Sequence, residues 1–214
     1  MPAPETTREQ TAPGPSLTRR DVASEPRGVV LMLHGGKQTS TQPVDHGSAS
    51  WRRLAAMQRR ITPRAHDAGV STWLLRYTVR GWNHGAPVAD ARWAIEEVRR
   101  ELGEVPVVLL GHSMGGRTAV HAADAPSVAG VVAVAPWWSS EDPVRTLTGR
   151  QVHAAHGRAD KITSARLTRT YLERATPVAT SASFTDMGRV GHYMFRRVDA
   201  WNTFAVDTAL DVLG

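Results

Sequence analysis

Five residues near the middle of the chain, Gly-His-Ser-Met-Gly at positions 111–115, have the types and spacing for nucleophilic catalysis. They follow the apolar stretch 105–110 and precede a segment with helical character. A G-x-S-x-G pattern between a strand and a helix is typical of a sharp turn that exposes a nucleophilic serine. The glycines are needed because larger side chains there would clash with the neighbouring strand and helix. Such a turn also points the Met114 amide into the site, where it can stabilise an oxyanion.

A serine hydroxyl needs a base and an orienting acid before it can attack a carbonyl carbon. His192 lies in a glycine-flanked stretch beyond the last predicted strand, and Asp160 follows a glycine turn after an earlier one. We therefore predict Ser113, Asp160 and His192 as the catalytic residues. Asp142 and Asp186 compete for the acidic role, and Asp160 has the alternative role of capping the helix that follows it.

The other histidines indicate no metal site. His34 and His112 each precede a turn residue, a position from which a side chain packs behind the site. His153 and His156 are three residues apart on a predicted strand, which places them on opposite faces. The chain has no cysteine, which excludes disulfides, thiolate nucleophiles and cysteine metal sites. We predict no metal and no cofactor.

The composition is that of one globular domain. The chain has 214 residues, of which 41% are hydrophobic and 21% are charged. Residues 1–26 contain no apolar core of a secretory signal, which predicts a cytoplasmic protein. No apolar run is long enough for a transmembrane helix, so we predict no membrane partner.

The net charge of +6 invites a nucleic-acid interpretation. The densest basic residues are four arginine pairs spread over predicted helices, at 52–53, 59–60, 99–100 and 196–197. A nucleic-acid groove would gather them on one face with aromatic platforms between them. We therefore predict that these pairs lie on solvated helix faces and that the protein has no nucleic-acid partner. The sequence does not predict an oligomeric state.

These side chains must be positioned by an alternation of strands and helices. Near-continuous apolar, β-branched runs predict buried strands, as in a parallel sheet, at 28–36, 71–79, 105–113, 128–136, 149–157 and 179–187. Helical patterns lie at 50–69, 87–102, 114–124, 163–174 and 199–213. The proline in the first of these is expected to kink or end that helix. The expected fold is a doubly wound α/β/α sandwich with a mostly parallel sheet of about six strands.

The domain organisation follows from the same patterns. Residues 27–214 are predicted to form a single domain. Residues 1–26 are rich in Pro, Thr, Glu and Arg, and are predicted to be disordered or weakly ordered, with at most one short strand near 17–22.

Four motifs occur in a recognisable order: H-G at a strand end, G-H-S-M-G-G at the turn, H-G-x-x-D, and G-H-x-M. In this order the chain resembles the α/β-hydrolase superfamily from about residue 28 to residue 212, in particular cap-less serine esterases and thioesterases of the dienelactone hydrolase and carboxylesterase type. The resemblance implies that residues 34–36 form the oxyanion loop. The amide of Gly36, or of Gly35 or Lys37, would then act together with that of Met114, and Gly35 would border the substrate.

The loops around the predicted site bear on the substrate. Only about 15 residues, 136–150, separate two strands where many members of the superfamily insert a helical cap, so we predict an open site without a cap. Trp137 and Trp138 leave the strand end beside the serine and are predicted to wall a substrate pocket, unless they pack under the loop. Trp82 is a candidate for a second wall. The resemblance also implies a smaller sheet, because its first two strands are absent here or reduced to one.

A serine nucleophile points to acyl chemistry, because relatives that act on haloalkanes or epoxides carry an aspartate instead. We predict a serine hydrolase that cleaves a small-molecule carboxylic ester or thioester through an acyl-serine intermediate. One alternative is acyl transfer or cyclisation, as in a discrete thioesterase. Another is a non-catalytic ligand-binding protein built on the same fold.

Overall fold

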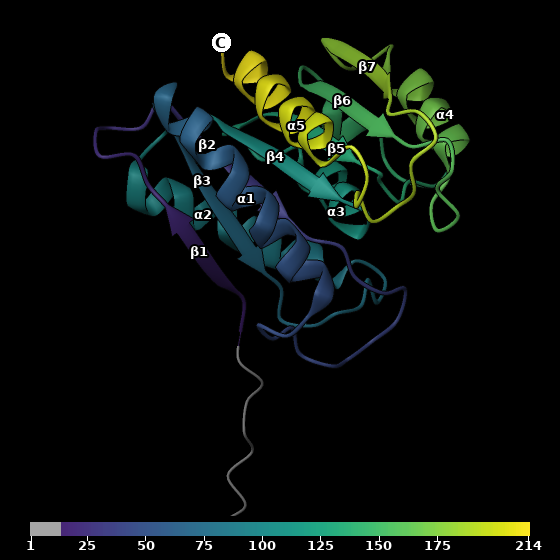
Figure 1. Cartoon of the computed structure of the whole chain (residues 1–214). Helices are drawn as coiled ribbons and strands as arrows, with labels where there is room; N and C mark the ends of the chain where they lie inside the picture. Colours follow the sequence, from purple (N-terminus) through teal and green to yellow (C-terminus); the bar gives the residue numbers. More distant parts are fainter. Residues whose placement is uncertain (1–13) are drawn as a thin grey trace, which may run out of the picture.

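A seven-stranded sheet runs through the centre of the protein (Figure 1). The computed structural model describes residues 14–214. The strands are β1 Ser16–Arg20, β2 Gly28–Leu33, β3 Val70–Arg76, β4 Val107–His112, β5 Val128–Val134, β6 Gln151–His156 and β7 Ser181–Asp186. They lie in the order β1-β3-β2-β4-β5-β6-β7, and all neighbours are parallel except β1 and β3. The predicted doubly wound, mostly parallel sheet is confirmed.

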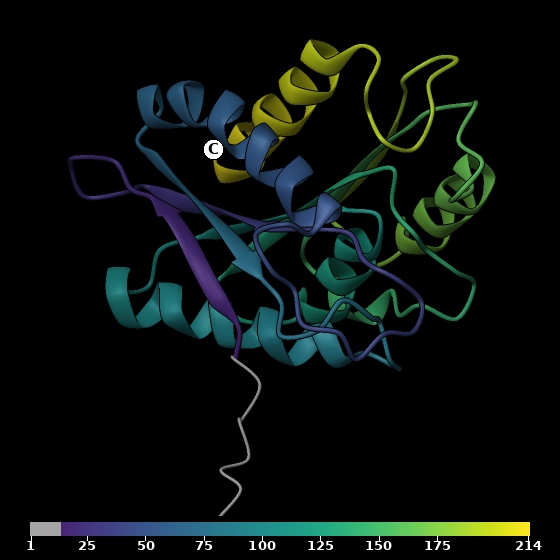
Figure 2. The same cartoon turned by 60° about the horizontal axis from the view of Figure 1, so that its bottom comes forward.

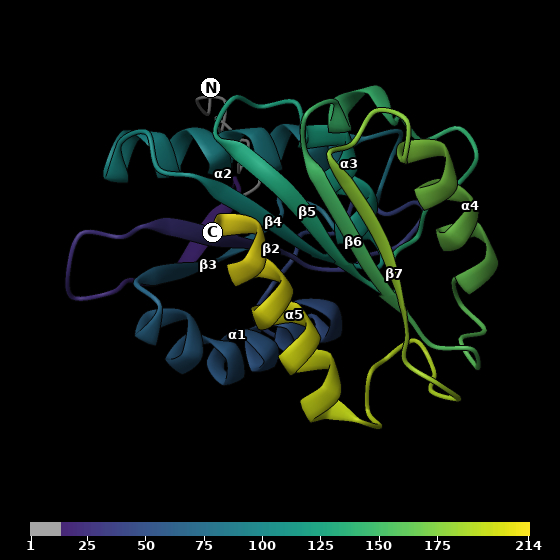
Figure 3. The ribbon, with the colours of Figure 1, turned by 90° about the horizontal axis from the view of Figure 1, so that it is seen from above.

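The five helices of the described residues cover the two faces of the sheet (Figures 2 and 3). Helices α1 Ala49–Asp67 and α5 Val198–Leu213 pack on one face, and α2 Ala86–Leu102, α3 Met114–Ala122 and α4 Ala165–Ala175 pack on the other. Strands β2 and β4 are buried along their whole length, because helices cover both of their faces. This explains why their sequences, GVVLML and VVLLGH, show no alternation of polar and apolar residues.

Helix α1 continues through Pro63 to Asp67. Proline removes one backbone donor and strains the preceding turn of a helix. Pro63 is exposed, so the carbonyl that loses its partner lies on the solvent side of the helix. The apolar face of α1 on either side of it stays buried through Leu54, Ile61 and Ala65. Tertiary packing therefore carries the helix past the proline.

A short strand forms in the N-terminal segment where the sequence analysis allowed one, near residues 17–22. Residues 16–20 form an ordered edge strand, β1, in antiparallel register with β3 from Ser16 opposite Arg76 to Arg20 opposite Thr72. An edge strand is stabilised by backbone pairing, for which a polar composition is no obstacle. Side chains add to it, since the Arg19 guanidinium lies 4.2 Å from the centre of the Trp73 ring. Residues 1–13, also predicted to be disordered or weakly ordered, lie outside the described residues.

The connection between β5 and β6 contains one short 3-10 helix, Arg145–Leu147, and no cap. Asp142 fixes this connection from within. Its buried carboxylate accepts hydrogen bonds from Arg117 Nε at 2.7 Å, His121 Nε2 at 3.0 Å and the Ser139 amide at 2.8 Å. None of the helices in residues 14–214 is long and apolar enough to cross a membrane.

Candidate active site

The predicted site residues follow the carboxyl ends of four parallel strands. Residues 34–36 follow β2, Ser113 follows β4, Asp160 follows β6, and His192 follows β7. Parallel strands place these ends along one edge of the sheet. Strands β2 and β4 are neighbours from which the chain winds in opposite directions, so the crevice between them is the topological switch point where ligands bind in such folds.

Ser113 occupies a strained turn between β4 and α3. Its φ of 55° and ψ of −118° are rare for a residue with a side chain. A Cβ on Gly111 would overlap the Gly115 carbonyl, and one on Gly115 would overlap the Leu33 carbonyl of the neighbouring strand. Both glycines therefore let α3 start close to the sheet. The strain holds the serine side chain at the mouth of the crevice.

Gly115→Ala is expected to lower the free energy of unfolding by about 3 kcal/mol, because the new methyl group has no space beside backbone atoms of β2. Urea denaturation of the purified variant measures this. Gly47→Ala is the matched control, since Gly47 is exposed and the nearest atom to its added Cβ is Asp45 Oδ1 at 3.4 Å. It should change stability by less than about 0.5 kcal/mol. Equal midpoints for the two variants would contradict the packing argument.

The three predicted catalytic side chains form a continuous hydrogen-bonded series. Ser113 Oγ lies 3.0 Å from His192 Nε2, and His192 Nδ1 lies 2.8 Å from Asp160 Oδ2. An ionised carboxylate only accepts hydrogen bonds, so Nδ1 carries the imidazole hydrogen and Nε2 accepts from the serine hydroxyl. Ser113 is 8% exposed and His192 5% exposed, so bulk water screens this series only weakly.

Asp160 is surrounded by donors. Its Oδ1 accepts from the amides of Ile162 at 2.8 Å and Thr163 at 2.9 Å. Its Oδ2 accepts from His192, from the Thr163 hydroxyl at 2.9 Å, and from His156 Nε2 at 3.1 Å. Burial by itself raises the pKa of Asp160, but the hydrogen bonds from His156, His192 and the two amides outweigh it and hold the pKa far below its usual range. The carboxylate therefore stays ionised.

The alternatives for the acidic position lie elsewhere. Asp186 is exposed and pairs with Arg158 at 3.3 Å, and Asp142 is held by Arg117 and His121 under the loop. Asp160 does not cap α4, because the hydroxyl of Ser164 accepts from the Leu167 amide at that helix end. The structure therefore brings Asp160 to His192 and leaves the other two aspartates away from it.

Of the three amides after β2 that the sequence analysis named as possible oxyanion donors, one is already hydrogen-bonded. The Lys37 amide donates to the Arg80 carbonyl at 2.8 Å, which removes it from the candidates for an oxyanion donor. Within residues 14–214, the amides of Gly35, Gly36 and Met114 have no acceptor. A Cβ on Gly35 would lie 3.2 Å from Ser113 Cβ, so this loop borders the serine.

His34 orients the peptide group that joins Gly35 to Gly36. The Tyr77 amide donates to His34 Nε2 at 3.4 Å, so the opposite nitrogen, Nδ1, carries the hydrogen and donates to the Gly35 carbonyl at 2.6 Å. The carbonyl of Gly35 and the amide of Gly36 point in opposite directions from the same planar group. Fixing the carbonyl therefore also fixes the Gly36 amide. Burial lowers the pKa of His34 to about 4, so the ring stays neutral.

His112 supports the loop that carries the base. Its Nε2 lies 3.2 Å from the His192 carbonyl, to which it donates. Burial, followed by the nearby His192, lowers the pKa of His112 to about 3 and keeps the ring neutral. Both His34 and His112 thus lie behind the site, as the sequence indicates, with structural contacts of their own.

Sequence reasoning missed two neighbours of Asp160. His156 ends β6, and Asp160 follows it after a tight turn. This spacing indicates in the sequence that the two side chains can meet, as they do here. Thr163 had no such signal, although its hydroxyl lies 2.9 Å from Asp160 Oδ2 and 3.1 Å from His192 Nδ1. His153 contacts Ser183 instead, so the two histidines of β6 are separated as predicted. No group of three metal-binding side chains occurs in the described part of the chain.

The three tryptophans that were predicted to wall a substrate pocket make different contacts. The guanidinium of Arg117 lies 4.6 Å from the Trp82 ring and 4.7 Å from the Trp137 ring, and the Trp137 amide donates to the Ser113 carbonyl at 3.0 Å. Trp138 is only 2% exposed, although it borders a hollow of about 480 Å³ beside Asp160. Its indole donates to the Gly116 carbonyl at 2.9 Å and its ring packs on Tyr171, so it supports the loop more than it walls a pocket.

A serine, an aspartate and a histidine after the ends of β4, β6 and β7 of a doubly wound sheet are the arrangement typical of α/β-hydrolases. Over residues 30–212 the sequence matches the profile of the alpha/beta hydrolase family. The chain belongs to this family. None of the curated proteins compared with the sequence matches it.

Solved structures with the same fold include several hydrolases. An alpha-beta serine hydrolase homologue from Coxiella burnetii is 15% identical with a TM-score of 0.71, over 91% of each chain. A serine hydrolase without a lid from Xanthomonas campestris is 17% identical with a TM-score of 0.68, over 92% of this chain and 88% of that one. Est1E from Butyrivibrio proteoclasticus, solved with ferulic acid bound, is 11% identical with a TM-score of 0.66, over 93% of this chain and 95% of that one.

Proposed function

We propose that this protein is a serine hydrolase that cleaves a small-molecule carboxylic ester or thioester through an acyl-serine intermediate. The observation that carries the proposal is the hydrogen-bonded series from Ser113 Oγ through His192 to Asp160, with distances of 3.0 and 2.8 Å. Both distances lie within the range over which a base can take a proton and an acid can orient that base.

In the proposed reaction, Ser113 Oγ attacks the carbonyl carbon while His192 Nε2 takes the hydroxyl proton. The carbonyl π electrons move onto oxygen, and the resulting oxyanion accepts hydrogen bonds from the amides of Met114 and Gly36. When the intermediate collapses, the bond to the leaving alcohol or thiol breaks and His192 returns the proton to it. A water molecule then attacks the acyl-serine by the same route, releasing the acid and the serine.

Two features support this assignment of roles. The Met114 amide lies at the N-terminus of α3, whose dipole favours a negative charge. The Gly36 amide is fixed through the Gly35 carbonyl by His34. An oxyanion donor of this kind is worth about 3 to 4 kcal/mol of barrier. Asp160, kept ionised by its donors, stabilises the imidazolium that forms in each step.

A fluorophosphonate probe tests the proposal directly, because it reacts with activated serines. We expect a covalent adduct on the Ser113 peptide by mass spectrometry, and none in Ser113→Ala. The labelled protein should also lose its turnover of 4-nitrophenyl acetate. A folded protein that gives no adduct would contradict the proposal and favour a binding protein with an idle site. Product analysis with a competing alcohol distinguishes hydrolysis from acyl transfer.

A further inference from the structure

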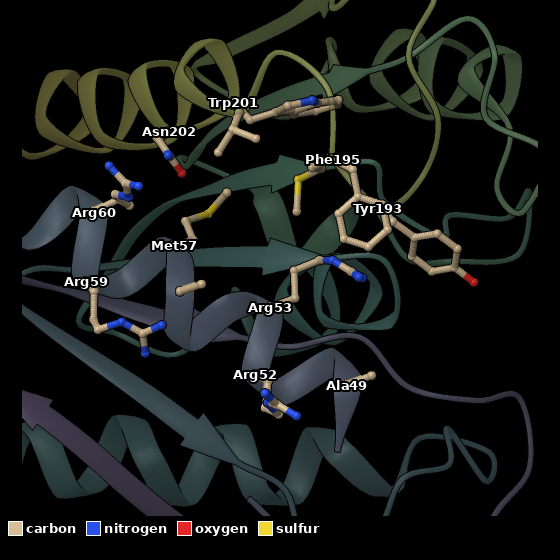
Figure 4. Close-up of a pocket in the computed structure, with 13 residues that line it drawn as sticks. Ala49, Arg52, Arg53, Met57, Arg59, Arg60, Tyr193, Phe195, Trp201 and Asn202 are labelled. Carbon is tan, nitrogen blue, oxygen red and sulfur yellow. The ribbon is translucent and has the colours of Figure 1, made fainter. Parts of the chain in front are cut away.

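An apolar groove of about 660 Å³ lies between α1 and the start of α5 (Figure 4). Its inner surface includes the buried side chains of Met57, Met194 and Trp201. Phe195 is 75% exposed and Tyr193 48% exposed, and both border the groove. Exposed aromatic side chains next to an apolar hollow mark a binding surface, and this volume is typical of small-molecule sites.

The edge of the groove is strongly basic. Arg52, Arg53, Arg59 and Arg60 of α1 all line it. Within residues 14–214, none of these four guanidinium groups has a carboxylate or hydrogen-bond acceptor. By contrast, Arg64 of the same helix pairs with Asp207, and Arg197 at the start of α5 donates to the Met187 carbonyl. The Arg53 guanidinium lies over two adjacent aromatic rings, 4.7 Å from the centre of Tyr193 and 4.6 Å from the centre of Phe195. The sequence analysis placed these two arginine pairs on solvated helix faces, and the tertiary structure brings them beside exposed aromatic residues.

The groove begins beside the catalytic histidine proposed above. Tyr193 directly follows His192, and the two ring centres are 5.3 Å apart. In the proposed reaction His192 returns its proton to the leaving alcohol or thiol, so the leaving group must lie on the His192 side of the scissile bond. The groove is therefore placed to hold the leaving group, while the acyl part lies toward the oxyanion loop.

We propose that the groove binds the leaving group of the substrate, an apolar chain that ends in an anionic group such as a carboxylate or phosphate. The apolar chain packs on Met57 and Trp201. The anion pairs with Arg53 and Arg60, which lie on either side of Met57 along α1 (Figure 4). This inference rests on the proposed function, because it names the substrate class of the same site.

The test compares 8-acetoxyoctanoate, whose leaving chain ends in a carboxylate, with its methyl ester, which is uncharged. Acetate release measures kcat/KM for each. We expect the anionic substrate to be favoured about tenfold at low salt, and the preference to shrink as salt is added. Arg53→Gln/Arg60→Gln should bring the ratio close to one. The matched control is Arg20→Gln/Arg145→Gln, which removes two exposed charges outside the groove and should keep the ratio.

Several outcomes would overturn the inference. The first is a wild-type ratio of one, and the second is an equal loss in the control variant, which would indicate a general effect of surface charge. The third is binding of phosphatidylglycerol vesicles or a single-stranded oligonucleotide that requires Arg53 and Arg60, without any preference for the anionic ester.

Failure of the proposed function gives a different pattern, in which neither ester is hydrolysed and no fluorophosphonate adduct forms. The groove is then tested by calorimetry with 8-hydroxyoctanoate, the expected product. Binding that is lost in Arg53→Gln/Arg60→Gln and kept in the control variant would support the anion site without catalysis. Absence of binding would reject it.

Discussion

Ser113→Ala is expected to lower kcat for 4-nitrophenyl acetate by about 10⁶, the scale found when the nucleophile of a serine hydrolase is removed. The reason is that Ser113 Oγ is the only hydroxyl within 3.0 Å of His192 Nε2 among the described residues. Without it the base has no nucleophile to activate, and only binding and the oxyanion donors remain. Steady-state release of 4-nitrophenol measures the loss, with circular dichroism to confirm folding.

A double variant tests whether Ser113 and His192 act as a unit. His192→Ala alone should cost about as much as Ser113→Ala, and Ser113→Ala/His192→Ala should cost no more than either, because groups that act in one step are far from additive. The control is His153→Ala, since His153 contacts Ser183 on β7 and not the series. Multiplicative losses in the double variant, or activity retained in either single variant, would contradict the proposed roles.

Asp160→Asn is expected to lower kcat by about 10⁴. An asparagine that turns its amide group toward His192 Nδ1 donates a hydrogen there, so the ring hydrogen moves to Nε2. The tautomer that can accept the Ser113 proton is then lost, although the geometry is kept. The amides of Ile162 and Thr163 can still donate to the remaining side-chain oxygen, so the variant should fold. Ester hydrolysis assays measure the loss of activity, and urea denaturation shows whether stability is lost as well.

Asp186→Asn is the control for the acidic position. Asp186 also follows a strand end in the sequence, but it pairs with Arg158 on the surface and has no contact with His192. Its substitution should leave kcat within about twofold, as for surface changes away from a site. If Asp186→Asn abolished activity and Asp160→Asn did not, the assignment of the acid would be wrong.

The local patterns of the sequence determined most of the fold. Apolar β-branched runs at 28–36 and 105–113 contain β2 and β4, and the helical patterns at 87–102 and 199–213 match α2 and α5 to within one residue. The turn at Ser113 was readable for the same reason, since its two glycines are required by contacts within a few residues of the serine or with the adjoining strand. Such features depend on short-range backbone sterics, which a single sequence carries.

Features that depend on distant residues were decided by the tertiary structure alone. Which of Asp160, Asp142 and Asp186 meets His192 depends on which loops end at the same edge of the sheet. The Lys37 amide is excluded as an oxyanion donor only because it meets the Arg80 carbonyl in the folded chain. A short strand near 17–22 was allowed by the sequence, but its antiparallel pairing with β3 was not readable from its polar composition. The groove forms where α1 meets the loop after His192, and these two segments are more than a hundred residues apart in the sequence. Sequence periodicity identifies the face of an element, but the partner of that face is fixed only when the whole core packs.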